Sequence, residues 1–274
     1  MKKVYHLDLD DSLVEGAKYA LLPGDPFRVE RIANYISERF NTFSKKLAWK
    51  REFCSYLTEI EGEKVLVVST GIGGPSTSIA VEELSMLGLK TFIRVGTTGA
   101  IQKYIEIGDV VITSASVRLD GASTHYAPIE YPASANYEVI QALREGAIIL
   151  GFKEGRIRIK GERAFHIGIT VSSDTFYPGQ ERYDSYTGYV IRKFRGSKEE
   201  WERLKCLNYE METATLLTLC NVFGLRCGAV TGVINTRSEG EEITESALKI
   251  GVENAISVGV EGIKILIEKE KRER

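Results

Sequence analysis

Short runs of apolar, β-branched residues recur along this chain, and segments with helical spacing separate them. Residues 65–68 and 91–95 form two of these runs, and both are typical of strands that are buried on both faces of a sheet. The stretch between them is long enough for a crossover helix, and Pro75 suits the first turn of that helix. This pattern predicts a strand–helix–strand unit with parallel strands.

The rest of the chain shows the same alternation of expected strands and helices. Strands are expected at residues 17–23, at 53–60 and 64–69 as a hairpin, at 109–113, at 117–121 as a continuation or a neighbour, at 156–160 as an extended edge, at 167–172 and at 226–234. Helices are expected after Pro26, with Val29, Ile32, Ala33 and Ile36 on one face, and at 136–150, 198–205, 213–223 and 244–268. We therefore predict a single α/β domain over residues 1–274, with a central mixed, largely parallel twisted sheet flanked by helices.

Composition narrows the class of protein. The 36 basic and 38 acidic residues nearly balance, so neither a nucleic acid nor an acidic membrane surface is indicated as a partner. No apolar run reaches the length of a membrane span, and residues 1–6 lead into acidic residues, which is unlike a signal peptide. We expect a cytoplasmic protein. Cys54, Cys206, Cys220 and Cys227 form no C-x-x-C pair, so they predict buried reduced thiols and no metal site.

Two glycine-containing turns follow predicted strands and carry arginines. Gly24 lies in the first turn, and Arg28 follows at the start of the next helix, where a cation opposes the helix dipole unless it faces an anion. Arg94 ends an apolar strand and precedes a Gly-Thr-Thr-Gly sequence at 96–99. Backbone N–H groups, hydroxyls and guanidinium groups at the carboxyl ends of parallel strands make a good oxyanion pocket. The alternatives are ordinary strand–helix turns and a solvated surface Arg28.

A polar, aromatic segment without periodicity covers residues 173–188 and leaves the end of a predicted strand, where ligand-facing loops lie. Gln180 and Arg182 lie two residues apart and offer an amide and a forked cation, which match the oxo and N–H edge of a pyrimidine. Phe176 is suited to stack on such a ring. The alternative is a surface loop with a structural ion pair between Arg182 and Asp184.

Glu210, Met211 and Glu212 lie between a predicted strand and a predicted helix. A carboxylate there suits the two hydroxyls of a ribose, and methionine forms an adaptable wall for the sugar. Acidic residues also favour helix N-termini, which is the structural alternative for this pair. Arg237 follows the last strand, and it either reaches the same site or is a loop cation. Together these groups suit the attack of phosphate on a nucleoside, and no Ser–His–Asp order, metal cluster or dinucleotide motif competes.

Several of these segments also resemble the bacterial uridine phosphorylases, the hexameric branch of the nucleoside phosphorylase family. The similarity covers nearly the whole chain and is carried by residues 23–26, 51–53, 69–83, 94–100, 115–122, 172–183 and 208–217. The stretch 172–183 contains the glutamine–arginine pair of members that cleave uridine. The resemblance implies the nucleoside phosphorylase fold and a pentosyltransferase that converts uridine and phosphate reversibly into uracil and ribose 1-phosphate, with inversion at C1′. It implies inorganic phosphate as co-substrate and no organic cofactor.

The resemblance also implies roles for individual residues. Phosphate would meet Gly24, Arg28, Arg94 and Thr97, with Arg51 from a neighbouring subunit. Ribose would meet Glu212, Met211 and Thr97 or Thr98, with His6 from the neighbour, and uracil would meet Phe176, Gln180, Arg182 and Arg237. Of these, the catalytic residues would be Arg94, Gln180, Arg182 and Glu212. Sites shared between subunits require a homo-oligomer, which in this family is a hexamer built as a trimer of dimers.

Some family members hold a potassium ion at a subunit interface, at positions that match Glu52, Ile72 and Ser76; a purely structural role for these is the alternative.

Asn235 departs from the family pattern, because uridine phosphorylases have an apolar residue there and purine-cleaving relatives have an aspartic acid. An amide can hydrogen-bond a base, so broader base tolerance, purines included, is the alternative to strict uridine preference. The segment 153–164 is longer than usual and has no assigned role. A nucleoside hydrolase and a non-catalytic nucleoside-binding protein also remain open.

Overall fold

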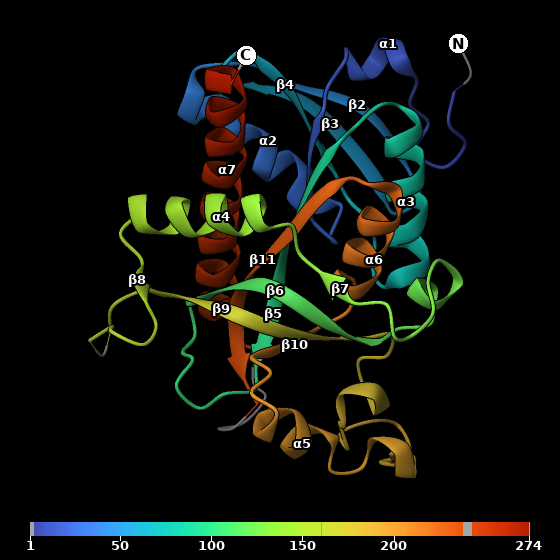
Figure 1. Ribbon diagram of the computed structural model, residues 1–274, viewed down its shortest axis with the longest axis vertical. Coiled ribbons are helices and arrows are strands. Elements are labelled where there is room, and N and C mark those ends of the chain that lie inside the picture. Colours follow the sequence, from blue (N-terminus) through green and yellow to red (C-terminus); the bar gives the residue numbers. More distant parts are fainter. Residues whose placement is uncertain (1–2, 160, 238–242, 274) are drawn as a thin grey trace.

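A mixed β-sheet forms the centre of the protein (Figure 1), which the computed structural model describes over residues 3–159, 161–237 and 243–273. Its strands follow one another in the order β10-β9-β6-β11-β5-β1-β4-β3-β2, with β7 paired to β6 and β8 to β9. The strands are β1 (Tyr19–Leu22), β2 (Ser44–Lys50), β3 (Phe53–Ile60), β4 (Glu63–Val68), β5 (Thr91–Ala100), β6 (Val110–Leu119), β7 (Ala133–Ser134), β8 (Lys153–Glu154), β9 (Ala164–Ser173), β10 (Asn208–Glu210) and β11 (Arg226–Thr236). The α-helices are α1 (Asp11–Val14), α2 (Phe27–Phe40), α3 (Gly74–Met86), α4 (Tyr137–Ile149), α5 (Ser197–Arg203), α6 (Thr213–Phe223) and α7 (Glu245–Glu273), and the 3-10 turns are η1 (Ala122–His125), η2 (Pro178–Gln180) and η3 (Arg192–Phe194).

The strands in the middle of the sheet run parallel, as their apolar sequences predict. β1 pairs in parallel with β4 and β5, and β5 pairs in parallel with β11. Leu21 and Ile93 face the core that α2, α4 and α7 cover, whereas Leu22 and Phe92 face the core that α3 and α6 cover. The carboxyl ends of β1, β5 and β11 therefore meet at one edge of the sheet, between the two helical layers.

One part of the sheet closes on itself. β10 pairs in parallel with β9 and antiparallel with β5, so β5, β11, β6, β9 and β10 form a closed ring of strands. Thr170 Oγ1 lies 2.7 Å from Thr113 Oγ1 and donates to Asn208 Oδ1 at 2.9 Å, and Asn208 Nδ2 donates to Thr98 Oγ1 at 2.8 Å. These buried polar groups are tolerated because they are hydrogen-bonded to one another. The ring thereby fixes the ends of β5, β10 and β11 relative to each other.

Most elements expected from the sequence are confirmed, including the β3–β4 hairpin, the continuation of 109–113 into a single strand β6, and the buried face of α2. The sequence pattern misses β2, which is a half-exposed strand at the edge of the sheet. The extended edge expected at 156–160 is wrong over its described residues 156–159, which form a turn and irregular structure; residue 160 lies outside the described residues. Ile157 and Ile159 are 76% and 73% exposed, so their alternation with arginine marks no buried face.

Contacts made by Arg158 account for the irregular path of this segment. Its Nη1 donates to both carboxylate oxygens of Asp109 at 2.7 Å, and its Nη2 donates to the carbonyl oxygen of Tyr104 at 2.7 Å. The Asp109 carboxylate is buried, and His166 Nε2 also lies 2.9 Å from it. Asp109 in turn pairs through its carbonyl oxygen with the backbone N–H of Val233 in β11. The segment 153–164 is therefore tied to the strand end that carries Asn235.

We expect Arg158→Met to destabilise the protein by about 3–5 kcal/mol, because it leaves the buried Asp109 carboxylate without its main counter-charge. Arg156→Met is a matched control, since Arg156 lies two residues away on the surface and its loss should change the free energy of unfolding by about 0.5 kcal/mol or less. Denaturant unfolding curves of both variants measure this difference. Equal stability of the two variants would contradict the anchoring role of Arg158.

Candidate active site

A cavity of about 640 Å³ opens at the carboxyl ends of β1, β5, β10 and β11. Ligands bind at this edge of α/β sheets because loops and helix N-termini converge there. Many residues that the sequence singles out lie together in its wall: Gly24, Arg28, Glu52, Ile72, Ser76, Arg94, Thr97, Thr98, Phe176, Gln180, Arg182, Met211, Glu212 and Asn235. Segments far apart in the sequence thus contribute to one site.

Arg94 lines the cavity and is 5% exposed; with Arg28 it forms the part of the wall called the phosphate end below. Its Nε donates to Glu210 Oε2 at 2.9 Å, and its Nη2 forms an ion pair with Glu212. Burial opposes its positive charge, but Glu212 and Glu210 more than offset this and raise the pKa of the guanidinium. Its Nη1 has no hydrogen-bond partner among the described residues, and a Cβ on Gly24 would lie 3.8 Å from it. Arg94 therefore keeps a donor directed toward the Gly24 turn.

Arg28 faces the same part of the cavity from the first turn of α2. Its Nε lies 3.6 Å from Asp25 Oδ2. Burial lowers the pKa of Arg28, Asp25 partly offsets this, and the nearby charge on Arg94 lowers the pKa further. An anion bound between two guanidinium groups reduces the electrostatic repulsion between their positive charges. Arg28, Arg94, Gly24 and Thr97 all line the cavity, and the oxyanion pocket expected at these residues stays a prediction.

Glu212 lies next to Arg94, at the start of α6. Its Oε1 accepts a hydrogen bond from the backbone N–H of Gly73 at 2.7 Å, in the turn that begins α3. Burial raises the pKa of Glu212, and Arg94 only partly offsets this. Met211 lines the cavity beside it. A carboxylate between an anion pocket and a methionine wall is well placed to accept hydrogen bonds from a sugar.

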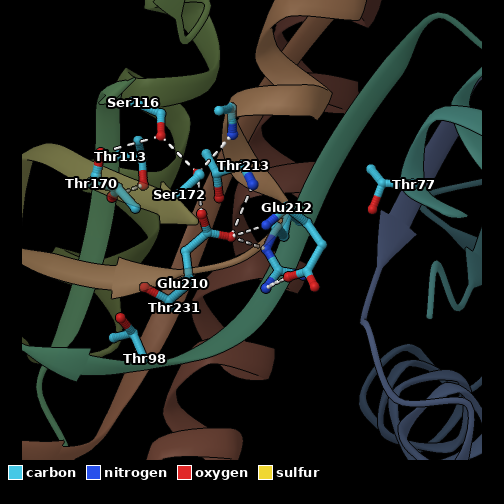
Figure 2. Close-up of polar contacts among 12 residues, drawn as sticks. Thr77, Thr98, Thr113, Ser116, Thr170, Ser172, Glu210, Glu212, Thr213 and Thr231 are labelled. Atoms are coloured by element: carbon cyan, nitrogen blue, oxygen red, sulfur yellow. Dashed lines mark hydrogen bonds and ion pairs between the residues drawn. The ribbon is translucent and has the colours of Figure 1, made fainter. Parts of the chain in front are cut away.

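Glu210 also lines the cavity, but it makes more hydrogen bonds within the protein than Glu212 does (Figure 2). Its Oε2 accepts from the backbone N–H groups of Glu212 and Thr213 at 2.8 and 2.9 Å, as well as from Arg94. Its Oε1 accepts from the Ser172 hydroxyl, which lies 2.8 Å from the Ser116 hydroxyl. The carboxylate of Glu210 therefore fixes the direction of Arg94 and caps the start of α6. The sequence analysis assigns the ribose to Glu212 and gives Glu210 no role of its own, so this orienting function was not predicted.

We expect Glu210→Gln to lower kcat/KM for phosphate by about tenfold, because Arg94 loses a charge-assisted hydrogen bond that orients it. Saturation curves with phosphate and with uridine separate this effect from a general loss of structure, since the phosphate KM should rise more than the nucleoside KM. Glu200→Gln, on the exposed face of α5, is the control and should leave both constants unchanged. An unaltered phosphate KM in Glu210→Gln would exclude the orienting role.

A second part of the cavity wall, called the base end below, is formed by Phe176, Gln180 and Arg182. Gln180 and Arg182 are 3% and 5% exposed, and both line the cavity. The guanidinium carbon of Arg182 lies 4.1 Å from the ring centroid of Phe176. Burial lowers the pKa of Arg182, and Asp184 partly offsets this effect. An amide, a cation and an aromatic ring thus share one end of the cavity.

Arg237 contacts the backbone of Gln180 and thereby stabilises this part of the cavity wall. Its Nη2 donates to the backbone carbonyl oxygen of Gln180 at 2.9 Å, and its guanidinium carbon lies 5.3 Å from the ring centroid of Tyr209. Burial and the nearby charge of Arg182 lower the pKa of Arg237 to about 10. Arg237 is absent from the described residues that line the cavity, so its contact with the site runs through Gln180.

Three other predicted site residues, Thr98, His6 and Arg51, differ in their relation to the cavity. The hydroxyl of Thr98 donates to the Tyr209 carbonyl oxygen at 2.5 Å and accepts from Asn208, so it is part of the strand ring. Among the described residues that line the cavity, neither His6 nor Arg51 occurs. His6 is held by Glu83, which accepts from the His6 backbone N–H and lies 2.7 Å from His6 Nδ1, and Arg51 is exposed in the β2–β3 turn. Their assignment to a neighbouring subunit stays a prediction.

The positions expected to hold potassium lie close together at the rim. Ser76 Oγ donates to the carbonyl oxygens of Ile72 and Gly73 at 3.2 and 3.3 Å. A Cβ on Gly71 would lie 2.7 Å from Glu52 Cγ and 3.1 Å from Ser76 Oγ, so this turn requires glycine. Within the described ranges, no three His, Cys, Asp or Glu side chains are grouped to hold a metal ion.

The four cysteines are buried free thiols, as expected. None of the described helices is long and apolar enough to span a membrane.

Comparison with known proteins identifies the family of this chain. The profile of the Phosphorylase superfamily matches residues 18–263. The chain belongs to the Phosphorylase superfamily. Within the superfamily, a uridine phosphorylase of Salmonella typhimurium is 50% identical over 264 residues, which cover 96% of this chain and 98% of that protein.

More distant relatives in the superfamily differ in the nucleoside they are named for. A uridine phosphorylase of Thermococcus kodakarensis is 44% identical over 259 residues, which cover 94% of this chain and 86% of that protein. A guanosine phosphorylase of Halorubrum lacusprofundi is 33% identical over 274 residues, which cover 97% of this chain and all of that protein (100%). The mixed sheet and flanking helices are those expected of the superfamily.

Proposed function

We propose that this chain catalyses the reversible phosphorolysis of uridine to uracil and ribose 1-phosphate, and that it acts on related pyrimidine nucleosides. One observation carries the proposal: a single cavity is lined by the pair Arg28 and Arg94 and, as a separate group, by Gln180 and Arg182. The uridine phosphorylases that are 50% identical over nearly the whole chain support the same reaction.

Inorganic phosphate occupies the end that contains Arg28 and Arg94, where a dianion relieves the repulsion between the two guanidinium groups. One phosphate oxygen attacks C1′ of the ribose while the C1′–N1 bond breaks, so the configuration at C1′ inverts. The sugar passes through an oxocarbenium-like state, and the phosphate stabilises its positive charge from one face. The arginines act mainly by holding the nucleophile in line with the bond that breaks.

The electron pair of the broken bond moves into the uracil ring, and the negative charge grows on O2 and O4. Arg182 and Gln180 receive this charge, and Phe176 stacks on the ring. Arg237 adds a second buried positive charge beside Arg182, which favours the anionic base. Because uracil anion is a tolerable leaving group once it is hydrogen-bonded, neither a covalent intermediate nor a dedicated general acid is required.

Ribose lies between these two ends. Glu212 accepts hydrogen bonds from its hydroxyls, and Met211 packs against the sugar face. Thr97, on the cavity wall, is the threonine available to sugar or phosphate, since the Thr98 hydroxyl is already bonded to Tyr209 and Asn208. Glu212 therefore orients the sugar while its ion pair with Arg94 connects it to the phosphate end.

We also propose that Arg51 and His6 complete the phosphate and ribose subsites of a neighbouring copy, which requires a homo-oligomer, a hexamer in the proposed arrangement. Potassium at Glu52, Ile72 and Ser76 belongs to the same proposal. A single domain over residues 1–274 and a cytoplasmic location are further predictions. No organic cofactor is needed for this reaction.

A second candidate is a nucleoside phosphorylase with broader base preference. Asn235 favours it, because this buried amide lines the cavity. The guanosine phosphorylase that is 33% identical also favours it. A nucleoside hydrolase or a binding protein would need only the base and ribose contacts, and would have no use for paired Arg28 and Arg94.

The test is base release from uridine, thymidine and inosine, each with and without inorganic phosphate. The proposal expects uracil only when phosphate is present, with an equal amount of ribose 1-phosphate. Release without phosphate would instead indicate a hydrolase, and binding without release would indicate a non-catalytic protein. Inosine cleavage at a rate similar to that of uridine would favour the broader enzyme.

A further inference from the structure

Asn235 is an unusual residue in the wall of the cavity. The residue is only 3% exposed, and its Nδ2 has no hydrogen-bond partner among the described residues. Buried N–H groups in native proteins are almost always paired, and those that are not generally have a functional explanation. The amide lies in a cavity wall, where a bound molecule can supply the missing acceptor.

The local backbone is built to place this amide. The pairing of β11 with β5 shifts register between Val233 and Asn235, so β11 contains a bulge that redirects the side chain. A Cβ on Gly99 in β5 would lie 2.6 Å from Asn235 Oδ1, so the amide fits only because Gly99 has no side chain. The residue before the bulge is fixed by Asp109, whose carbonyl oxygen accepts from the backbone N–H of Val233.

The amide lies toward the base end of the cavity. A Cβ on Gly99 would also lie 3.6 Å from Arg237 Cδ, so Asn235 and Arg237 pack over the same glycine. Arg237 in turn holds the backbone of Gln180. Asn235 packs on Gly99, which lies further along β5 than Gly96, the glycine beside the Arg94 guanidinium. Its natural partner is therefore the base and not the phosphate.

We propose that Asn235 Nδ2 donates a hydrogen bond to an exocyclic oxo group of the base. This inference rests on the proposed phosphorolysis and defines its substrate class as nucleosides whose base presents an oxo group at this edge. A site built to hydrogen-bond a substrate oxygen disfavours analogues that lack it, because its own buried donor is then left unpaired. Asn235 is thus a specificity-determining residue for the departing base.

The test compares kcat/KM for uridine, 2-thiouridine and 4-thiouridine with phosphate, since sulfur is a weaker hydrogen-bond acceptor than oxygen. In Asn235→Val, the preference for uridine over one of the two thio analogues should fall about tenfold relative to the wild type. Asn235→Asp keeps the shape but replaces the donor by a carboxylate oxygen, and it should lose the same preference. If one of the two variants folds poorly, the other still measures the loss of preference.

Thr236→Val is the matched control, because Thr236 is the next residue in β11 and lies outside the described residues that line the cavity. It should keep the wild-type preference for uridine over both analogues. Unchanged preferences in both Asn235 variants would overturn the inference. That result is distinct from failure of the proposed function, which would appear as no phosphate-dependent cleavage of uridine by the wild type.

Discussion

Arg182→Ala is expected to lower kcat for uridine phosphorolysis by roughly 10²-fold or more, on the scale of losing one oxyanion-hole donor. Arg182 lies at the base end of the cavity, stacked on Phe176, where the charge of the departing uracil grows. Because this interaction strengthens as the bond breaks, kcat should fall along with kcat/KM. Steady-state rates of uracil formation at saturating phosphate measure the effect.

Arg192→Ala is the control for this variant, since Arg192 is an exposed residue of η3 and its loss should leave kcat unchanged. Arg182→Lys should recover only part of the lost rate, because lysine lacks the forked donor geometry of arginine. A near-normal kcat in Arg182→Ala would rule out charge stabilisation by Arg182.

Arg94→Met should lower kcat/KM for phosphate by about 10²-fold or more, because it removes the buried cation that faces both the phosphate end and Glu212. It also leaves Glu210 and Glu212 close together without a counter-charge, so we expect the unfolding free energy to fall by about 3–5 kcal/mol. Phosphate saturation curves and denaturant unfolding measure the two effects separately.

Arg28→Met keeps this test informative if Arg94→Met folds poorly. Arg28 has no buried carboxylate partner comparable to those of Arg94, and its loss should raise the phosphate KM with little change in stability. Arg31→Met, one turn further along α2, is the control and should leave the phosphate KM unchanged. A normal phosphate KM in both Arg28→Met and Arg94→Met would place the anion elsewhere.

Much of the fold follows from local sequence. Apolar β-branched runs mark β4 and β5, and the spacing of Val29, Ile32, Ala33 and Ile36 marks the buried face of α2, because burial on one or both sides restricts which residues fit. The sequence also predicted the glycine turns at the strand ends and the polar loop around Gln180. These features identify the residues of a site because ligand contacts demand particular side chains.

What local sequence does not reveal is which groups pair across the fold. The Arg-Ile-Arg-Ile alternation at 156–159 looks like a strand, but Arg158 is drawn into the buried pair with Asp109 and the isoleucines stay exposed. The sequence analysis favours Glu212 for the ribose, but local sequence does not show that Glu210 accepts hydrogen bonds from the backbone N–H groups of Glu212 and Thr213. Such differences depend on partners distant in the chain. The closing of the β5–β10 pair is unpredictable for the same reason.

Soaking crystals of the protein in phosphate and uridine tests most directly whether the two guanidinium groups hold the nucleophile beneath the sugar. The account predicts one phosphate within hydrogen-bonding distance of both Arg28 and Arg94, with Arg182 and Gln180 on the uracil oxygens at the other end. A ligand complex in which Arg28 and Arg94 turn away from the phosphate would contradict it.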